Sequence, residues 1–348
     1  MHLGQLAPAV ALRRLRQGVR LRTGPFVVAL RSDIAALSQQ VLQQYAEHEL
    51  AEDDGFSDFH IRITPPAGLR RWWRPQARFV FDGAEHFNPL PLHHAFPLLE
   101  WGLNWCVSMH AHQYVILHAA VLERGGRAVV LPAPSGSGKS TLCAALAHRG
   151  WRLLSDELAL LGLEDGLLWP LTRPISLKNQ SIGLIRDFAP DARIGEPVPD
   201  TIKGAVAHCA PPAAAVRAAQ TPARPGWIVL PRYTPDAPAA LTPLPKAQAV
   251  MELIDACFNY SIHRHQGFAA LGRLVDGSDC HRFEYSRLED AIAVFDRLAE
   301  ADPDEPSVTP TMALPAPLPA SHSASHSASL PVSQPVSQPA STTGDAAP

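Results

Sequence analysis

Cysteine is scarce in this chain, and the few cysteines show no pattern. The 348 residues include 5 cysteines, which are scattered and form no C-x-x-C pair. An odd number of isolated cysteines excludes a disulfide framework and a zinc-finger type of site, and it is typical of proteins in a reducing compartment. We therefore expect a cytoplasmic protein.

An excess of charge of one sign is also absent. With 30 Lys and Arg against 33 Asp and Glu, the formal net charge is −3. A balance of this kind predicts no basic surface for nucleic acid. Residues 1–22 are interrupted by arginines, and no apolar run approaches the roughly 20 residues of a membrane-spanning helix. We expect neither a nucleic-acid partner nor stable membrane insertion, whereas the possibility of a homo-oligomer stays open.

The most informative segment is a phosphate-binding loop. Residues 133–140 read APSGSGKS and match the pattern G-x-x-x-x-G-K-[ST], except that Ala133 occupies the first glycine position. Gly136 and Gly138 allow backbone conformations in which successive N–H groups point at phosphate oxygens. Lys139 would reach the β- and γ-phosphates, and the Ser140 hydroxyl would face Mg²⁺. The residues expected to bind the nucleotide are Pro134, Ser135, Gly136, Ser137, Gly138, Lys139, Ser140 and Thr141.

The residues on either side of the loop have the expected character. Residues 127–131 form an apolar run that predicts a buried strand, and residues 139–148 predict a helix. A strand, a glycine-rich loop and a helix in this order are the context that such a motif requires. The tolerance of alanine at position 133 depends on the backbone φ angle there. The predicted fold class is α/β, with a mixed sheet.

Three regions differ in composition. Residues 1–110 mix short strand and helix patterns and predict a smaller α+β region, and residues 111–300 contain the loop and form the expected ATP-binding domain. Within residues 111–300, the Ala- and Pro-rich segment 205–226 is expected to loop out. Residues 301–348 consist mostly of Pro, Ser, Ala and Thr, which cannot bury enough apolar surface to fold, so we expect a disordered tail.

Two acids and a histidine accompany the loop in the sequence. Asp156 and Glu157 end a short apolar stretch just after the helix that follows the loop. One such carboxylate can hold Mg²⁺ while the other takes a proton from an attacking hydroxyl; the alternative is a turn or a surface acid pair. His118 lies 15 positions before Ala133. It could contact a phosphate or the attacking group, or it could be an ordinary core or edge histidine.

These segments together resemble the C-terminal kinase domain of HPr kinase/phosphorylase, whose fold is related to that of phosphoenolpyruvate carboxykinase. In that family a His-Gly pair precedes a loop of the form G-x-S-G-x-G-K-S, and a stretch like RGHRLVADD follows it. Here these places hold His118-Ala119, residues 133–140 and residues 149–157, which read RGWRLLSDE, and the spacings agree without a gap.

The resemblance implies an HPr-kinase-like core with ATP and Mg²⁺ as cofactors. By position, Lys139 and Ser140 correspond to residues that bind the nucleotide phosphates and Mg²⁺. Asp156 corresponds to the acid/base residue of the family, Glu157 to a metal ligand and His118 to the active-site histidine.

The later signature of the family is missing. Where the family has a run like EIRGLGIINV, residues 169–180 read WPLTRPISLKNQ, which argues against HPr as the substrate and against phosphorolysis. Arg173 and Lys178 in this segment could neutralise phosphate charge or could be ordinary surface cations. With its N-terminal extension and the Phe-Asn-Tyr element at residues 258–260, the chain resembles the group called HprK-related kinase A. That group is associated with exosortase-type protein-sorting gene clusters.

The expected function is transfer of the γ-phosphate of ATP to a hydroxyl, serine or serine-like, of an acceptor that the sequence does not identify. Asp156 would deprotonate this hydroxyl, and Lys139 and Mg²⁺ would stabilise the developing charge. One alternative is an ATP-binding sensor or assembly protein without turnover. Another is a nucleoside or small-metabolite kinase, which would share the loop.

Overall fold

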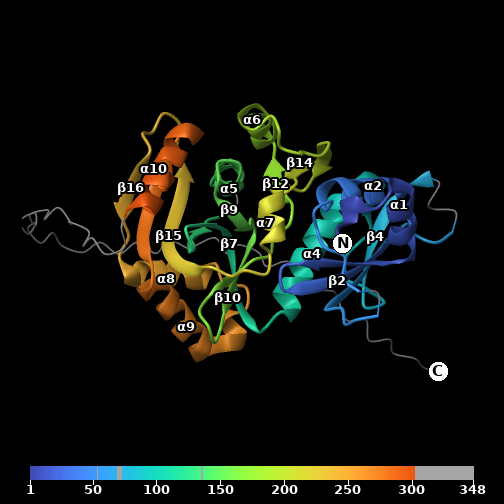
Figure 1. Ribbon diagram of the computed structural model, residues 1–348, viewed down its shortest axis with the longest axis horizontal. Helices are drawn as coiled ribbons and strands as arrows, with labels where there is room; N and C mark the ends of the chain where they lie inside the picture. The colour runs from blue at the N-terminus through green and yellow to red at the C-terminus, as the bar shows by residue number, and fades with distance from the viewer. Residues whose placement is uncertain (53, 69–72, 135, 302–348) are drawn as a thin grey trace, which may run out of the picture. The chain divides into compact units, whose positions relative to one another are not determined.

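The computed structural model describes residues 1–301 with the exception of residues 53, 69–72 and 135. The predicted α/β class is confirmed, because helices pack on mixed sheets in the part of the chain that is described (Figure 1). Ser135 of the loop and residues 302–348 of the tail lie outside the described residues. None of the described helices combines the length and the apolar character needed to cross a membrane.

The N-terminal region is built around a sheet with helices on it. Its strands, in spatial order, are β1 (Val19–Thr23), β2 (Phe26–Ser32), β3 (Phe59–Thr64), β4 (Gln76–Phe81) and β5 (Ala84–Glu85), with β6 (Leu90–Pro91) also paired to β4. Its helical segments are η1 (Leu3–Gln5), α1 (Pro8–Gln17), α2 (Ala35–Gln44), η2 (Leu92–His94) and α4 (Ala95–His110). Strand β2 is antiparallel to β1 and parallel to β3.

A second, larger sheet carries the phosphate loop. Its strands are, in spatial order, β11 (Leu168–Trp169), β10 (Leu158–Gly162), β7 (Tyr114–Arg124), β8 (Arg127–Pro132), β15 (Arg224–Tyr233), β17 (Asp279–Tyr285) and β16 (Ala240–Pro243), and β9 (Arg152–Ser155) also pairs with β7. Strand β15 is parallel to both β8 and β17, and the other pairings are antiparallel. The apolar run 127–131 is thus a central strand, as predicted.

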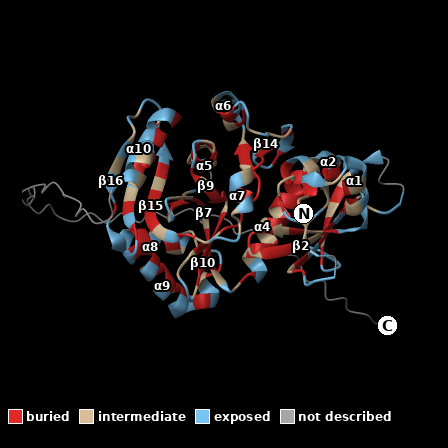
Figure 2. Ribbon diagram, in the orientation of Figure 1, coloured by how far each residue is buried: buried red, intermediate tan, exposed pale blue. Residues whose placement is uncertain are grey.

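Helices cover both faces of this sheet. Successive side chains along each strand point to opposite faces, and both sets are apolar. On β8, Val129 and Leu131 join the core formed with α5 (Lys139–Ala147) and α10 (Leu288–Glu300). Ala128 and Val130 point the other way, toward α8 (Lys246–Asp255) and α9 (Tyr260–Asp276). The strands between these layers are largely buried (Figure 2).

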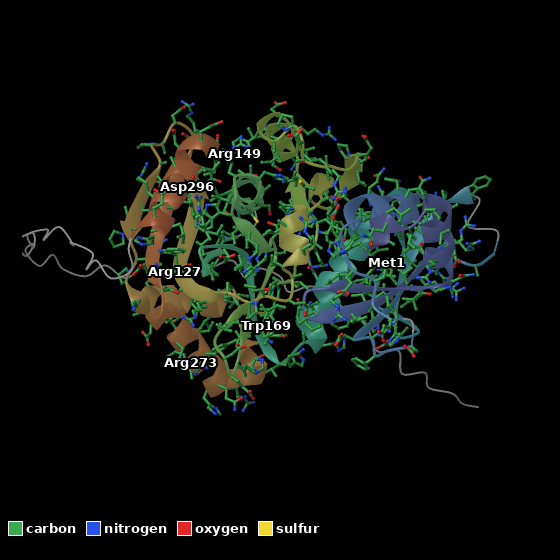
Figure 3. All side chains as sticks on the ribbon, viewed as in Figure 1. Met1, Arg127, Arg149, Trp169, Arg273 and Asp296 are labelled. Atoms are coloured by element: carbon green, nitrogen blue, oxygen red, sulfur yellow. The ribbon has the colours of Figure 1, made fainter. Side chains whose placement is uncertain are left out.

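Half-buried polar contacts also hold α10 against the sheet. Asp296, labelled on α10 in Figure 3, accepts a hydrogen bond of 3.0 Å from Trp151 Nε1 and a second one from Arg124 on β7. Asp296 is a charged residue beside the apolar face with which this amphipathic helix packs on the sheet. The contacts therefore fix the helix that packs beside α5 and the loop.

A small sheet lies next to the loop helix, and it overturns one expectation. It contains β12 (Ile175–Lys178), β14 (Gly204–Cys209) and β13 (Val198–Thr201), and it is accompanied by α6 (Gln180–Phe188) and α7 (Ala213–Arg217). The prediction that residues 205–226 loop out was wrong, because this segment contains most of β14, all of α7 and the start of β15. Its Val206, Ala207 and Cys209 are buried, and Pro212 precedes α7, where proline costs no hydrogen bond.

The two larger sheets share a hydrophobic core. Ile116 of β7, Leu158 and Leu160 of β10, and Leu171 belong to the same buried cluster as the apolar residues of the N-terminal region. Met1–Asp302 accordingly form one compact unit. The N-terminal region therefore lies directly against the strands that lead to the phosphate loop.

Candidate functional site

The loop between β8 and α5 has the backbone of a phosphate-binding site. Gly136 and Gly138 both have a φ of +89°, a region that residues with a Cβ avoid. A Cβ at Gly138 would also lie 2.6 Å from Tyr285 Oη, so glycine is needed there for space as well. Ala133, in contrast, is not among the described residues with positive φ. Alanine is therefore compatible with the first position of the motif.

A cleft of about 460 Å³ adjoins this loop. Ten of the predicted site residues line it, namely His118, Pro134, Gly136, Ser137, Gly138, Lys139, Ser140, Thr141, Glu157 and Lys178. The structure thus brings the phosphate loop together with residues from β7, β12 and the turn after β9. A cavity of this size is within the range of small-molecule and cofactor sites.

Sequence reasoning missed Lys203, which lines the cleft from the turn between β13 and β14. It lies in the turn of a hairpin whose second strand, β14, falls mostly in the segment 205–226 that was expected to loop out. Its neighbour Ile202 also lines the cleft and is 93% exposed. Lys203 adds a further cation to a cleft that already contains Lys139 and Lys178.

Lys139 is buried without a hydrogen-bonding counterpart. It is only 5% exposed, and its Nζ atom makes no hydrogen bond to any described residue. Burial lowers its pKa, while the negative charges of Asp156 and Glu157 act in the opposite direction. An ammonium group in this state lacks the partners that normally offset its desolvation. A phosphate in the cleft would supply them.

Glu157 faces the cleft as a carboxylate. Its Oε1 lies 3.7 Å from Lys178 Nζ, and its Oε2 accepts a hydrogen bond of 2.7 Å from Asn104 Nδ2. Burial alone would raise the pKa of Glu157, but Lys178, Lys203 and Lys139 outweigh it and the pKa is lowered. The group is therefore negatively charged at neutral pH.

Glu157 and Ser140 offer the oxygen ligands that Mg²⁺ prefers, and both line the same cleft. Within the described residues, no group of three or more His, Cys, Asp or Glu side chains could hold a metal ion. At nucleotide sites Mg²⁺ needs only one or two protein ligands, because waters and phosphate oxygens supply the rest. The residues present fit a metal that arrives with its nucleotide.

His118 lies on β7 opposite Leu158 of β10, and its ring lines the cleft. Burial, followed by the nearby charge of Lys139, lowers its pKa to about 4. The imidazole is therefore neutral at physiological pH and can accept a hydrogen bond or a proton. Its backbone N–H donates to Ala256 O at 2.8 Å, which fixes the strand at this residue.

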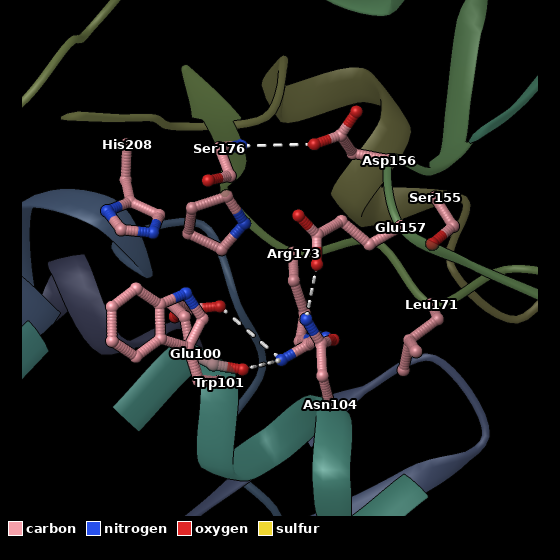
Figure 4. Close-up of a pocket in the computed structure, with 11 residues that line it drawn as sticks. Glu100, Trp101, Asn104, Ser155, Asp156, Glu157, Leu171, Arg173, Ser176 and His208 are labelled. Atoms are coloured by element: carbon pink, nitrogen blue, oxygen red, sulfur yellow. Dashed lines mark hydrogen bonds and ion pairs between the residues drawn. The ribbon is translucent and has the colours of Figure 1, made fainter. Parts of the chain in front are cut away.

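Asp156 lies beside the cleft but does not line it. It faces a smaller pocket of about 20 Å³, which shares Glu157 and Ser176 with the cleft (Figure 4). Its Oδ2 accepts a hydrogen bond of 3.1 Å from the Ser176 N–H, whereas its Oδ1 has no partner in the described part of the chain. Burial raises the pKa of this carboxyl, against the effect of Lys139. Its environment favours uptake of a proton.

Arg173 lies beside the larger cleft and not in its lining. It lines the smaller pocket, and its Nη1 pairs with Glu100 Oε2 at 3.4 Å while its Nη2 donates to Asn104 Oδ1 (Figure 4). The described residues that line the larger cleft do not include it. Arg173 is thus part of a buried ion pair and is not an ordinary surface cation; that it neutralises phosphate charge stays a prediction. Lys178 lines the cleft, as expected.

Comparison with known proteins does not identify the site: a scan against protein-family models finds no match for the chain, and a search of the curated proteins finds no relative.

Proposed function

We propose that this protein is an ATP- and Mg²⁺-dependent phosphotransferase of the HprK-related kinase A type, which resembles HPr serine kinase. The observation that carries the proposal is the buried, unpartnered ammonium of Lys139 beside the glycine-rich loop. It lies in one cleft with His118, Glu157 and Lys178. A concave site that combines backbone N–H groups, several cations and an acid suits a nucleoside triphosphate better than an uncharged ligand.

Each group has a role that follows from its position. The loop N–H groups and Lys139 bind the phosphates, and Lys178 and Lys203 add positive charge from the facing side of the cleft. Ser140 and Glu157 would hold Mg²⁺. When bound, the ion would offset the negative charge that develops on the phosphate during transfer. Neutral His118 can accept a hydrogen bond from the attacking group.

Asp156 is the proposed base. The acceptor hydroxyl would enter where the two cavities meet, at Glu157 and Ser176, so that its proton passes to the unpartnered Oδ1 of Asp156. The hydroxyl oxygen then forms a bond to the γ-phosphorus, and the bond between that phosphorus and the β–γ bridging oxygen breaks to release ADP. The smaller pocket has room for little more than one water-sized group. A primary hydroxyl such as that of serine meets this limit.

The second candidate is an ATP-binding sensor that does not transfer phosphate. One observation favours it: Asp156 does not line the larger cleft, so a nucleotide could bind there without contacting the base. In that case the cleft would respond to nucleotide through the hairpin that contains Lys203.

The location that we propose is the cytoplasm, where ATP is available. All five cysteines are described, and all are free thiols. This supports a reducing compartment.

The deciding experiment is a transfer assay with γ-labelled ATP against candidate proteins and free serine. The wild type is compared with Lys139→Ala and Asp156→Asn. We expect transfer by the wild type only, with nucleotide binding retained by Asp156→Asn and lost by Lys139→Ala. A wild type that binds ATP·Mg²⁺ but transfers phosphate neither to an acceptor nor to water would establish the sensor instead. Full activity of Asp156→Asn would show that another group is the base.

A further inference from the structure

A series of polar side chains, buried at Tyr45, Glu100 and Arg173 and half-buried at Asn104, links the N-terminal region to Glu157. Tyr45 Oη donates to Glu100 Oε1 at 2.6 Å, and Glu100 Oε2 pairs with Arg173 Nη1 at 3.4 Å. Arg173 Nη2 donates to Asn104 Oδ1, and Asn104 Nδ2 donates to Glu157 Oε2 at 2.7 Å (Figure 4). The series therefore begins just after α2, passes through α4 and ends at an acid that lines the proposed nucleotide cleft.

The direction of each hydrogen bond in this series is determined. A guanidinium has donors only, so the Asn104 oxygen must face Arg173 and its NH₂ group must face Glu157. Asn104 thus presents a donor to Oε2 of the carboxylate, while Lys178 lies 3.7 Å from Oε1. The carboxylate is held on one side by the N-terminal region and on the other by β12.

Burial makes this arrangement specific. The side chains of Arg173 and Glu100 are 8% and 6% exposed. Charges in such surroundings are costly unless they are paired and hydrogen-bonded, so an alternative rotamer of Arg173 or Asn104 would leave a buried group without its partner. A network of this kind has one favoured arrangement, and Glu157 is its last member.

We propose that Asn104 is a positioning residue that fixes the Glu157 carboxylate for the nucleotide site, so that helix α4 of the N-terminal region completes that site. The inference rests on the proposed function, because the position of Glu157 affects nucleotide chemistry only if the cleft binds nucleotide. Residues 1–110 contain no sequence motif that indicates a function. Through Asn104 they would help to build the nucleotide site.

Asn104→Asp separates positioning from packing. Aspartate has nearly the shape of asparagine and still accepts a hydrogen bond from Arg173, which becomes an ion pair. It loses the donor to Glu157 and places one carboxylate against another, which is unfavourable. If Asn104 only fills space and pairs with Arg173, this substitution is neutral or stabilising. Asn88→Asp is the matched control, because it makes the same change at an exposed position of the same region.

The first measurement needs no ligand. Thermal unfolding at pH 7.5 is compared for the wild type, Asn104→Asp, Glu157→Gln, the double variant and Asn88→Asp. We expect Asn104→Asp to lower Tm by roughly 2–5 °C in the wild type and to have little effect when residue 157 is glutamine, since the repulsion is then removed. Equal shifts in both backgrounds would overturn the proposal.

The second measurement is ATP affinity by isothermal titration calorimetry, with and without Mg²⁺. Asn104→Asp should weaken binding of ATP·Mg²⁺ about 10-fold more than binding of metal-free ATP, and Asn88→Asp should change neither. Equal weakening of both, or no weakening, would overturn the positioning role. If the wild type binds no ATP, the proposed function fails, and the unfolding comparison alone decides whether Asn104 sets the position of Glu157.

Discussion

The two cavities that meet at Glu157 and Ser176 differ in how their buried cations are paired. In the larger cleft, Lys139 Nζ makes no hydrogen bond to a described residue. In the smaller pocket, Arg173 contacts both Glu100 and Asn104. Removing a buried cation from its partners leaves an uncompensated charge behind, whereas a buried cation without partners is costly until a ligand arrives. We therefore expect Arg173 to matter most for folding and Lys139 to matter most for ligand binding.

The largest effect is expected from removing the paired cation. Arg173→Met leaves the Glu100 carboxyl buried without its partner, so we expect the free energy of unfolding to fall by about 3–5 kcal/mol. Urea denaturation measures this loss.

The same variant has a pH dependence with a defined sign. Burial raises the pKa of Glu100 to about 7 even when Arg173 is present. A raised carboxyl pKa means that the folded protein holds a proton that the unfolded chain releases, so stability falls as pH rises from about 4.5 through 7. Arg173→Met should therefore be more destabilised at pH 8 than at pH 6. Adding Glu100→Gln should remove that difference, and if the difference persists, another group causes it.

The second largest effect is expected from removing Lys139, the cation without a hydrogen-bonding partner. This effect is on ATP binding and not on folding. Lys139→Met should weaken ATP binding roughly 100-fold, about 2.7 kcal/mol, and should leave unfolding stability unchanged or increased because an uncompensated charge is removed. Calorimetric titration and urea denaturation measure the two quantities. Lys246→Met, at an exposed position, is the matched control. A loss of stability as large as that of Arg173→Met would remove the distinction between the cavities.

A smaller effect is expected on the uptake of protons that accompanies ATP binding. The pKa of His118 is lowered to about 4 by burial and by Lys139, and phosphate charge in the cleft would raise it again. Binding of metal-free ATP near pH 5.5 should therefore add protons to His118, which the dependence of binding enthalpy on buffer ionisation reveals. His118→Gln should take up fewer protons than the wild type. Equal uptake by both would show that phosphate binds away from His118.

The smallest effect is expected at the first position of the loop motif. Because Ala133 does not have a positive φ, Ala133→Gly relieves no strain and only makes the unfolded chain more flexible. We expect a loss of about 0.4–1 kcal/mol in unfolding stability and unchanged ATP affinity. Tighter binding by the variant would show instead that alanine impairs the loop.

The sequence was sufficient for the parts of the site that depend on local pattern. The loop follows from a motif flanked by a strand and a helix, and His118, Glu157 and Lys178 do line its cleft. The positions of Asp156 and Arg173 relative to the cleft could not be predicted from the sequence, because both residues contact segments that are distant in the chain. Arg173 meets Asn104 across 69 residues of chain, and no local pattern in α4 marks Asn104 as a partner.

Lys203 shows a different limit. It sits in the turn of a hairpin just before residues 205–226, a stretch whose alanines and prolines are typical of a loop. Burial of β14 against the loop helix overrides that composition, because Ala207 and Cys209 pack into the same core as α5. Composition therefore gave the wrong prediction for residues 205–226, and the hairpin that β14 forms there places Lys203 at the cleft.

The core shared by the two larger sheets has a consequence for synthesis of the chain. The N-terminal region buries its apolar residues together with Ile116, Leu158, Leu160 and Leu171. A ribosome delivers Ile116 after the first 110 residues, and it delivers Leu158, Leu160 and Leu171 only after the phosphate loop as well. The N-terminal sheet must then wait, incompletely covered, until the loop and its acids are made. The core of the N-terminal region would thus be completed only after the loop-containing segment of the chain has been made.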